Sequence, residues 1–116
     1  MKVDKPWGYE LRWALTERYV GKVIHIDAGQ ALSLQYHNVK DETILVWTGR
    51  IRFEIQHEQG KTVKEMGPGD NAHITPGTVH RMTALEDTDI FEVSTPELED
   101  VVRLEDRYGR LTQGKP

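Results

Sequence analysis

Apolar and polar residues alternate in short runs along most of the chain, a pattern typical of β-strands whose two faces meet different surroundings. The clearest run is LSLQYH at 32–37, in which every second side chain is apolar. A second run, ETILVWT at 42–48, places Glu42 on the same face as Ile44 and Val46. No segment repeats its apolar residues with the sustained period of a helix. The pattern therefore predicts a protein built of strands.

Turn residues separate these runs at short spacing, as expected for an all-β sandwich or barrel. Tight turns are predicted at Gly49, at 59–60, and where Gly and Pro cluster at 67–70 and 75–77. From Pro96 onward the alternation gives way to a charged stretch, which we expect to form one helical turn and a tail across the barrel mouth. Further strands are predicted at 5–15, 18–27, 50–56, 61–66, 71–74, 78–85 and 88–95.

Length and charge narrow the class of protein. The chain has 116 residues, enough for one domain (1–116) with a core at about 6–95 and a C-terminal tail at 96–116. Its formal charge of −4 argues against general nucleic-acid binding. The absence of cysteine excludes disulfide scaffolds and thiolate metal sites, and is compatible with the cytoplasm, where we expect the protein. The apolar runs are too short for a membrane span, and no secretory signal is visible at the start.

Side chains of metal-ligand type gather in the two central runs. If 32–37 and 42–48 pair as strands, Gln35, His37 and Glu42 point into one cavity, and His80 is a fourth candidate from a later strand. A single histidine in a strand is more often an ordinary polar residue. Several ligand-type residues at a fixed spacing make metal binding the better interpretation.

That spacing resembles the two sequence motifs of the cupin superfamily. The first motif is matched by Gly29, five residues, Gln35-x-His37, four residues, Glu42, six residues and Gly49, with Gln where most cupins have His. The second is matched by Gly69-Asp70 and then Thr75-Pro76-Gly77-x2-His80, with Thr75 where cupins usually place Pro. The resemblance implies a single-domain cupin fold, which is a double-stranded β-helix or jelly-roll barrel. It also implies one divalent transition metal (Zn, Mn, Fe, Ni or Co), for which imidazole, amide and carboxylate ligands are suited.

A narrower resemblance covers nearly the whole chain. The segments KPWGYE at 5–10, LSLQYH at 32–37, TVHR at 78–81 and VRLEDRYGR at 102–110 are similar to the type II mannose-6-phosphate isomerase cupin domain. This resemblance implies a metal-dependent aldose–ketose isomerase in carbohydrate or polysaccharide-precursor metabolism, with a sugar phosphate as its small-molecule substrate and a homodimeric assembly. The phosphate anchors that it implies are Lys22, Arg81 and Arg110, at positions where the family has Lys or Arg.

An isomerase needs a general base to move a proton between adjacent carbons. The candidates are His73 and Glu92, which lie on predicted strands near the second motif. We expect the tryptophans Trp7, Trp13 and Trp47 to pack in the core or in an interface, since each falls at an apolar repeat or boundary of a strand.

The chain departs from this family beside its first motif. It has Asn38-Val39-Lys40 and Thr43 where the family usually has further His and Arg residues and a Glu-His-Trp run. Two other functions therefore stay open: a metal-dependent cupin oxygenase with a three-ligand site, and a non-catalytic barrel that binds a sugar or a small acid.

Overall fold

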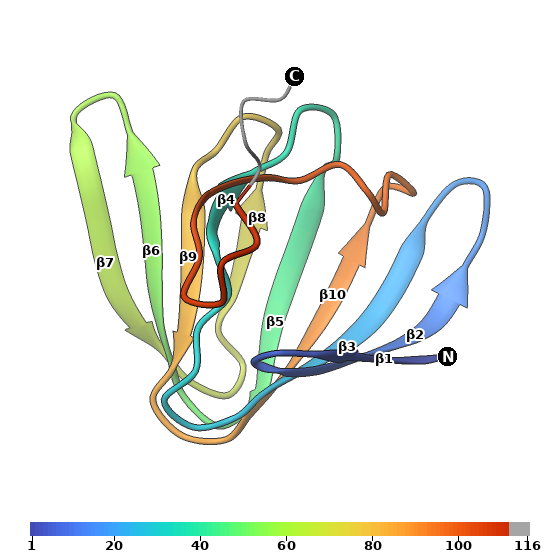
Figure 1. Ribbon diagram of the computed structural model, residues 1–116, viewed down its shortest axis with the longest axis horizontal. Helices are drawn as coiled ribbons and strands as arrows, with labels where there is room; N and C mark the ends of the chain where they lie inside the picture. Colours follow the sequence, from blue (N-terminus) through green and yellow to red (C-terminus); the bar gives the residue numbers. More distant parts are fainter. Residues whose placement is uncertain (112–116) are drawn as a thin grey trace.

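Two antiparallel sheets face each other in the computed structural model, which describes residues 1–111 (Figure 1). One sheet has six strands in the order β1-β2-β3-β10-β5-β8, and the other has five in the order β11-β4-β9-β6-β7. The predicted all-β class is confirmed, and residues 1–111 form no helix. The strands are β1 (Lys2–Lys5), β2 (Gly8–Leu15), β3 (Val20–Ile26), β4 (Leu34–Tyr36), β5 (Glu42–Thr48), β6 (Ile51–His57), β7 (Gly60–Met66), β8 (Asn71–Ile74), β9 (His80–Ala84), β10 (Thr88–Ser94) and β11 (Val102–Glu105).

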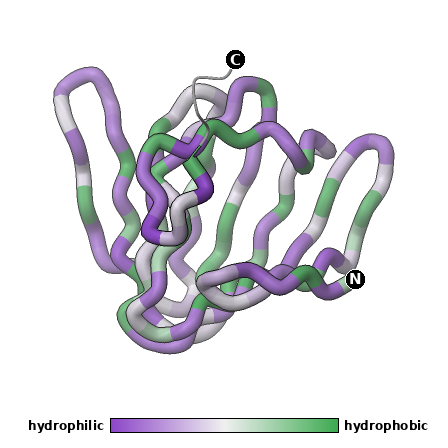
Figure 2. The backbone as a smooth tube through the Cα atoms, in the orientation of Figure 1, coloured by the Kyte–Doolittle hydropathy of each residue, from purple (hydrophilic) through white to green (hydrophobic). Residues whose placement is uncertain are grey.

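The core lies between the sheets and follows directly from the alternation in the sequence. Hydrophobic and hydrophilic positions alternate along the strands in Figure 2, and the apolar side chains that point inward from both sheets form one cluster. Burying such side chains contributes about 1.5–3 kcal/mol each. The fully buried members are Ile26, Ile44, Val46, Ile51, Ile74 and Ile90, with Phe53 at 2% exposure.

The inward face of the six-stranded sheet changes character along its length. At one end the inward residues of β3 and β10 are Ile26 and Ile90, whereas at the other end they are Lys22 and Glu92. The two charged residues are register partners on adjacent strands, and both are buried. One end of the space between the sheets is therefore an apolar core, and the other end is a polar pocket.

The turn between β5 and β6 shows why one predicted turn residue must be glycine. Gly49 has a φ of 89°, a left-handed backbone conformation that other residues rarely adopt. A Cβ atom there would lie 2.4 Å from the carbonyl oxygen of Asp87. Gly49 therefore allows β5 to turn back into β6, as the sequence predicted.

The C-terminal region corrects one expectation. Instead of a helical turn, residues 96–105 cross from the end of β10 to the other sheet, where β11 pairs with β4 (Figure 1). The first strand, β1, was also not predicted and pairs with β2. Residues near both ends of the described chain, among them Lys5 and Arg110, thus line the polar pocket. Within residues 1–111, no helix is long and apolar enough to cross a membrane.

Candidate metal centre and the pocket around it

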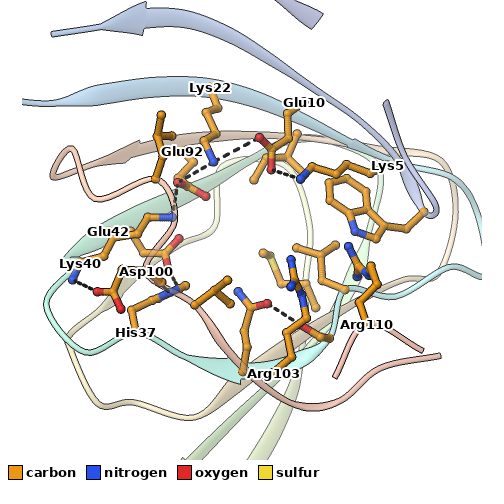
Figure 3. A pocket seen from close by; sticks show the side chains of 18 of the residues that line it. Lys5, Glu10, Lys22, His37, Lys40, Glu42, Glu92, Asp100, Arg103 and Arg110 are labelled. Atoms are coloured by element: carbon orange, nitrogen blue, oxygen red, sulfur yellow. Dashed lines mark hydrogen bonds and ion pairs between the residues drawn. The ribbon is translucent and has the colours of Figure 1, made fainter. Parts of the chain in front are cut away.

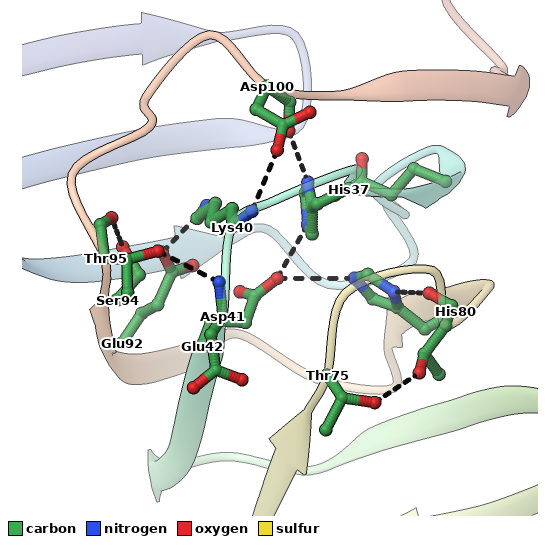
Figure 4. Close-up of polar contacts among 12 residues, drawn as sticks. His37, Lys40, Asp41, Glu42, Thr75, His80, Glu92, Ser94, Thr95 and Asp100 are labelled. Carbon is green, nitrogen blue, oxygen red and sulfur yellow. Dashed lines mark hydrogen bonds and ion pairs between the residues drawn. The ribbon is translucent and has the colours of Figure 1, made fainter.

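Three side chains from three chain segments converge at the polar end of the barrel (Figure 4). His37 follows β4, Glu42 begins β5 and His80 begins β9. His37 Nε2 lies 2.7 Å from Glu42 Oε2, and His80 Nε2 lies 3.7 Å from the same oxygen. All three are nearly inaccessible to solvent, with exposures of 1–3%. Their ligand atoms lie within 4.8 Å of one another, close enough to contact a single ion.

The hydrogen bonds of the two imidazoles determine what this cluster can bind. His37 Nδ1 lies 2.6 Å from the carbonyl oxygen of Asp100, and His80 Nδ1 lies 2.9 Å from that of Thr78. A carbonyl oxygen only accepts, so each Nδ1 must carry a hydrogen, and each neutral ring presents a bare lone pair at Nε2. These Nε2 atoms and Glu42 Oε2 have no hydrogen-bond partner in the described chain. When both rings are neutral, two nitrogen lone pairs and a carboxylate oxygen face one another, an arrangement that can bind a cation.

The electrostatics of His80 and Glu42 suit the binding of a cation. Burial lowers the pKa of His80, which keeps this imidazole neutral. Burial opposes the charge on Glu42, but the contact with His37 and the charge of Lys40 outweigh it and lower the pKa of Glu42 to about 2. At neutral pH the cluster thus offers an ionised carboxylate and at least one neutral imidazole. This donor set fits a first-row divalent cation.

Gln35, the fourth expected ligand, lines the same pocket as His37 and Glu42. It is the register partner of His80 across the β4–β9 pair. Its Oε1 accepts a hydrogen bond of 2.6 Å from the hydroxyl of Ser33. A second lone pair remains on that oxygen, so Gln35 adds an oxygen donor at the edge of the site.

Asp100 holds the loop that carries His37. Its carboxylate accepts hydrogen bonds from the backbone N–H groups of Asn38, Val39 and Lys40, the last two at 2.7 and 2.8 Å. Although slight burial opposes the charge, these N–H donors lower the pKa of Asp100 to about 2. The C-terminal segment therefore fixes both the backbone after His37 and, through the Asp100 carbonyl, the orientation of the His37 ring.

We expect Asp100→Ala to lower the free energy of unfolding by about 1–2 kcal/mol at pH 7, because three backbone donors lose a charged acceptor. The folded-state pKa lies below the ordinary value of 3.8, so the stabilisation is complete above pH 3.8 and lost as the pH falls towards about 2. Urea denaturation of the wild type and the variant at a series of pH values measures both effects. Glu99→Ala, at an exposed neighbour, is the matched control. An equal gap between wild type and variant at pH 7 and pH 2.5 would contradict this account.

A chain of alternating charges continues from the cluster along the pocket wall (Figure 3). Glu92 Oε2 lies 3.2 Å from Lys40 Nζ and 4.0 Å from Lys22 Nζ, and Lys22 Nζ lies 3.2 Å from Glu10 Oε1. All four side chains are buried. Burial and the neighbouring Glu42 carboxylate raise the pKa of Glu92, against the attraction of the two lysines. The pocket thus holds a carboxyl group that can exchange a proton beside the candidate metal centre.

The other residues singled out in the sequence have different positions. His73 is exposed, and its Nε2 lies 2.7 Å from Asp41 Oδ1. It is not among the residues that line the pocket. Arg81 is paired with Glu105 and also lies outside the pocket lining. Lys22 is inside, enclosed by the carboxylates of Glu10 and Glu92. Arg110 also lines the pocket, and its guanidinium group donates to Asp106 through Nε and one terminal nitrogen. Of the two candidate bases, only Glu92 faces the site.

Besides Asp100, five charged residues of the pocket were not identified from the sequence. On β2 the polar face points inward and the apolar face is exposed. The alternation in the sequence showed that β2 has two different faces, but not which of them points into the barrel. Lys40 lies at a position where the chain departs from the family pattern, and only its charge could have indicated that it belongs to the pocket. The residues are Lys5, Glu10, Arg12, Lys40 and Arg103.

The sequence and the fold both match known proteins. The family model described as "Cupin domain" matches residues 22–94. Mannose-1-phosphate guanylyltransferase ManC of Salmonella typhimurium is 36% identical over 118 aligned residues, which cover 95% of this chain and 23% of that protein. Xanthan biosynthesis protein XanB of Xanthomonas campestris pv. campestris is 30% identical over 114 residues, covering 94% and 24%. The chain thus spans about a quarter of the length of these curated relatives.

Solved structures share the fold at lower sequence identity. KdgF from Halomonas sp. superposes with a TM-score of 0.71 at 21% identity, covering 83% of this chain and 87% of that one. Oxalate decarboxylase from Bacillus subtilis gives a TM-score of 0.74 at 20% identity, covering 90% and 30%. A further neighbour is described by its double-stranded β-helix domain. The predicted jelly-roll architecture is therefore confirmed.

Proposed function

The chain belongs to the cupin domain family, and from this premise we propose that it is a metal-dependent aldose–ketose isomerase acting on a sugar phosphate of the mannose 6-phosphate type. One observation carries the proposal: a buried carboxyl group, Glu92, faces the same pocket as the three convergent acceptors. Isomerisation needs these two functions side by side, a cation to stabilise an oxyanion and a base to move a proton.

His37, Glu42 and His80 would hold the ion, with Gln35 as an additional oxygen donor. A bound divalent cation would supply electrostatic stabilisation for negative charge on the oxygens of the substrate. The protein contributes the orientation of the ligands, because the carbonyls of Asp100 and Thr78 fix both rings with Nε2 towards the site. The same fixed tautomers favour a metal ion at this position.

Glu92 would transfer the proton. Its carboxylate removes the proton from C2 of the open-chain aldose, the C–H electron pair forms the C1–C2 double bond of an enediol, and the O1 oxygen gains a proton. Return of the proton to C1, with loss of the O2 proton, gives the ketose without any oxidant or reductant. Lys40 and Lys22, at 3.2 and 4.0 Å, hold the carboxylate and offset its charge in a buried site.

The substrate class is supported by the relatives and by the charges of the pocket. ManC is named for mannose 1-phosphate and XanB for xanthan biosynthesis, so both concern sugar metabolism. The pocket combines lysine and arginine side chains with carboxylates, which suits a polyhydroxylated, anionic ligand. A cytoplasmic location stays a prediction.

The proposal is tested by a coupled assay for conversion of mannose 6-phosphate to fructose 6-phosphate. Protein purified without chelator is stripped of metal and then reconstituted separately with Mn²⁺, Zn²⁺, Co²⁺, Ni²⁺ and Fe²⁺. We expect turnover that depends on added metal and is absent in the stripped protein. Saturable metal binding with no turnover on mannose 6-phosphate would contradict the isomerase assignment.

A second candidate function is a cupin oxygenase. The observation that favours it is the set of two histidines and one carboxylate, since Gln35 bonds to Ser33 and leaves a three-ligand site. Oxygen uptake by the Fe²⁺ form alone would support this alternative. Ligand-dependent thermal stabilisation with neither turnover nor oxygen uptake would support a binding module.

We also propose a homodimer formed through the outer face of the six-stranded sheet. Trp13, Trp47 and Val93 on this face are 60%, 56% and 53% exposed. The Trp47 ring stacks on Phe91 with centroids 5.2 Å apart. Trp13 lies against Gly21, where a Cβ atom would come within 2.7 Å of the ring. An exposed apolar surface of this kind marks an interaction site.

Trp13→Glu is expected to convert the dimer into a monomer, because a carboxylate would be buried in the interface. Size-exclusion chromatography with light scattering gives the mass. Val63→Glu, on the edge strand of the other sheet and 46% exposed, is the matched control and should leave the mass unchanged. A wild-type protein that is monomeric at high micromolar concentration would overturn the proposal.

A further inference from the structure

Basic side chains from both ends of the chain meet in the pocket, across from the candidate metal centre. Lys5 ends β1, Arg12 lies on β2, Arg103 lies on β11, and Arg110 follows a turn held by Asp106. All four line the pocket. Figure 3 shows Lys5, Arg103 and Arg110 on one side of the opening, and His37 and Lys40 on the other.

The charges of this basic cluster (Lys5, Arg12, Arg103 and Arg110) are crowded. Burial together with Arg12, Lys22 and Arg103 lowers the pKa of Lys5, and Glu10 opposes them. Burial and Arg110 likewise lower the pKa of Arg103, against Asp106 and Glu99. Partly buried positive charges therefore lie close together in this pocket, although the net charge of the whole chain is −4. Crowding of cations is stabilised when an anion binds among them.

The contacts of Lys5, Arg12 and Arg110 with neighbouring carboxylates use only some of their donors. The Glu10 carboxylate forms ion pairs with Arg12 Nε at 3.1 Å and with Lys22 Nζ at 3.2 Å, whereas Lys5 Nζ lies 4.0 Å from it. Arg12 meets Glu10 through Nε, and Arg110 meets Asp106 through Nε and one terminal nitrogen. Guanidinium groups carry five N–H donors in a planar fork, which matches the oxygens of a phosphate.

The cluster lies outside the segment that the cupin domain model matches. The cupin model matches residues 22–94, which include His37, Glu42 and His80. Lys5 and Arg12 precede this segment, and Arg103 and Arg110 follow it. The segments on either side of residues 22–94 thus place a second set of charged groups in the barrel that holds the candidate metal centre.

We propose that Lys5, Arg12, Arg103 and Arg110 form a subsite for the phosphate group of a phosphate monoester whose reacting end lies at the candidate metal centre. The inference rests on the proposed function for what happens at that end. In the open-chain form of a hexose 6-phosphate, the carbonyl and the phosphate lie at opposite ends of the carbon chain. A pocket with an oxyanion site on one side and a phosphate site on the other selects such a substrate over the free sugar. This subsite replaces Lys22 and Arg81 as phosphate anchors and retains Arg110.

The subsite is tested by calorimetric titration of the metal-free protein with inorganic phosphate, mannose 6-phosphate, mannose and glucuronate. We expect saturable binding of inorganic phosphate and mannose 6-phosphate in competition with each other, and no binding of mannose. Arg103→Gln and Lys5→Gln should each weaken phosphate binding about 10- to 100-fold, the effect of a lost charged hydrogen bond. Arg52→Gln, an exposed arginine on β6, is the matched control and should leave the affinity unchanged.

Three results would overturn the subsite: no phosphate binding by the folded wild-type protein, equal phosphate affinity in all variants, or glucuronate binding that is as tight as phosphate binding and lost in the same variants. Circular dichroism shows whether each variant is folded, and Arg12→Gln replaces any variant that is not. Binding without metal separates the two proposals. Phosphate binding that depends on Arg103 without isomerase turnover upholds the subsite and contradicts the proposed function. Isomerase turnover with the same KM in the wild type and in Arg103→Gln upholds the proposed function and contradicts the subsite.

Discussion

His37→Ala and His80→Ala are each expected to abolish metal-dependent turnover and to weaken metal binding by more than about 100-fold. The physical reason is the loss of one of three convergent donors from a buried site, whereas loss of an outer-shell partner alone costs about 10- to 100-fold in affinity. In the wild type, added metal should raise the melting temperature, because the ion binds only the folded cluster. Neither variant should show this rise. Metal content, turnover and melting curves measure the three effects.

The matched control for these variants is another histidine of the same chain. His57 is exposed on β6 and contacts Thr62 at 3.0 Å, so His57→Ala should leave metal binding and turnover unchanged. His73→Ala should also retain turnover, since His73 is exposed and not among the pocket residues. A His80→Ala protein that still bound one metal ion with wild-type affinity would contradict the three-donor site.

Glu92→Gln is expected to lower kcat by about 10²- to 10⁴-fold, the range typical of a lost general base. The amide keeps the shape and one oxygen of the side chain but cannot take up the substrate proton. Because Glu92 is not one of the three convergent donors, metal affinity should change little. A fall in kcat without loss of bound metal therefore distinguishes a base from a ligand.

The control for this variant is Glu58→Gln, in the exposed turn between β6 and β7. It removes the same charge from the chain and should leave kcat unchanged. If Glu92→Gln retained kcat within about threefold of the wild type, Glu92 would not be the base. If it lost metal together with activity, the residue would belong to the metal centre.

The parts of the fold that were predicted depend on local patterns. Strict alternation fixes which residues share a face of a strand, and β5 carries Glu42 with Ile44 and Val46 inward as expected. The motif spacing places His37 directly after β4 and places Glu42 and His80 at the starts of β5 and β9. Such features need only the sequence around each residue.

The parts that were missed depend on distant pairing. On β2 either face could point inward, and the structure buries Glu10 while Trp13 is exposed. Which face of β2 is buried depends on its pairing with β3 and on the charged groups of the pocket, and not on the sequence of β2 alone. Pairing of β11 with β4 joins residues more than sixty positions apart and has no local signature. The basic cluster and the Asp100 contacts follow from that pairing, so charge alone could not place them.

The central claim, that His37, Glu42 and His80 bind one metal ion, is tested most directly by titrating the metal-stripped wild-type protein with Co²⁺. Equilibrium dialysis gives the stoichiometry, and visible absorption reports the ligand field. The account predicts saturation at one ion per chain, with absorption bands that are absent in His80→Ala. Protein that is folded by circular dichroism yet shows no saturable Co²⁺ binding would contradict it.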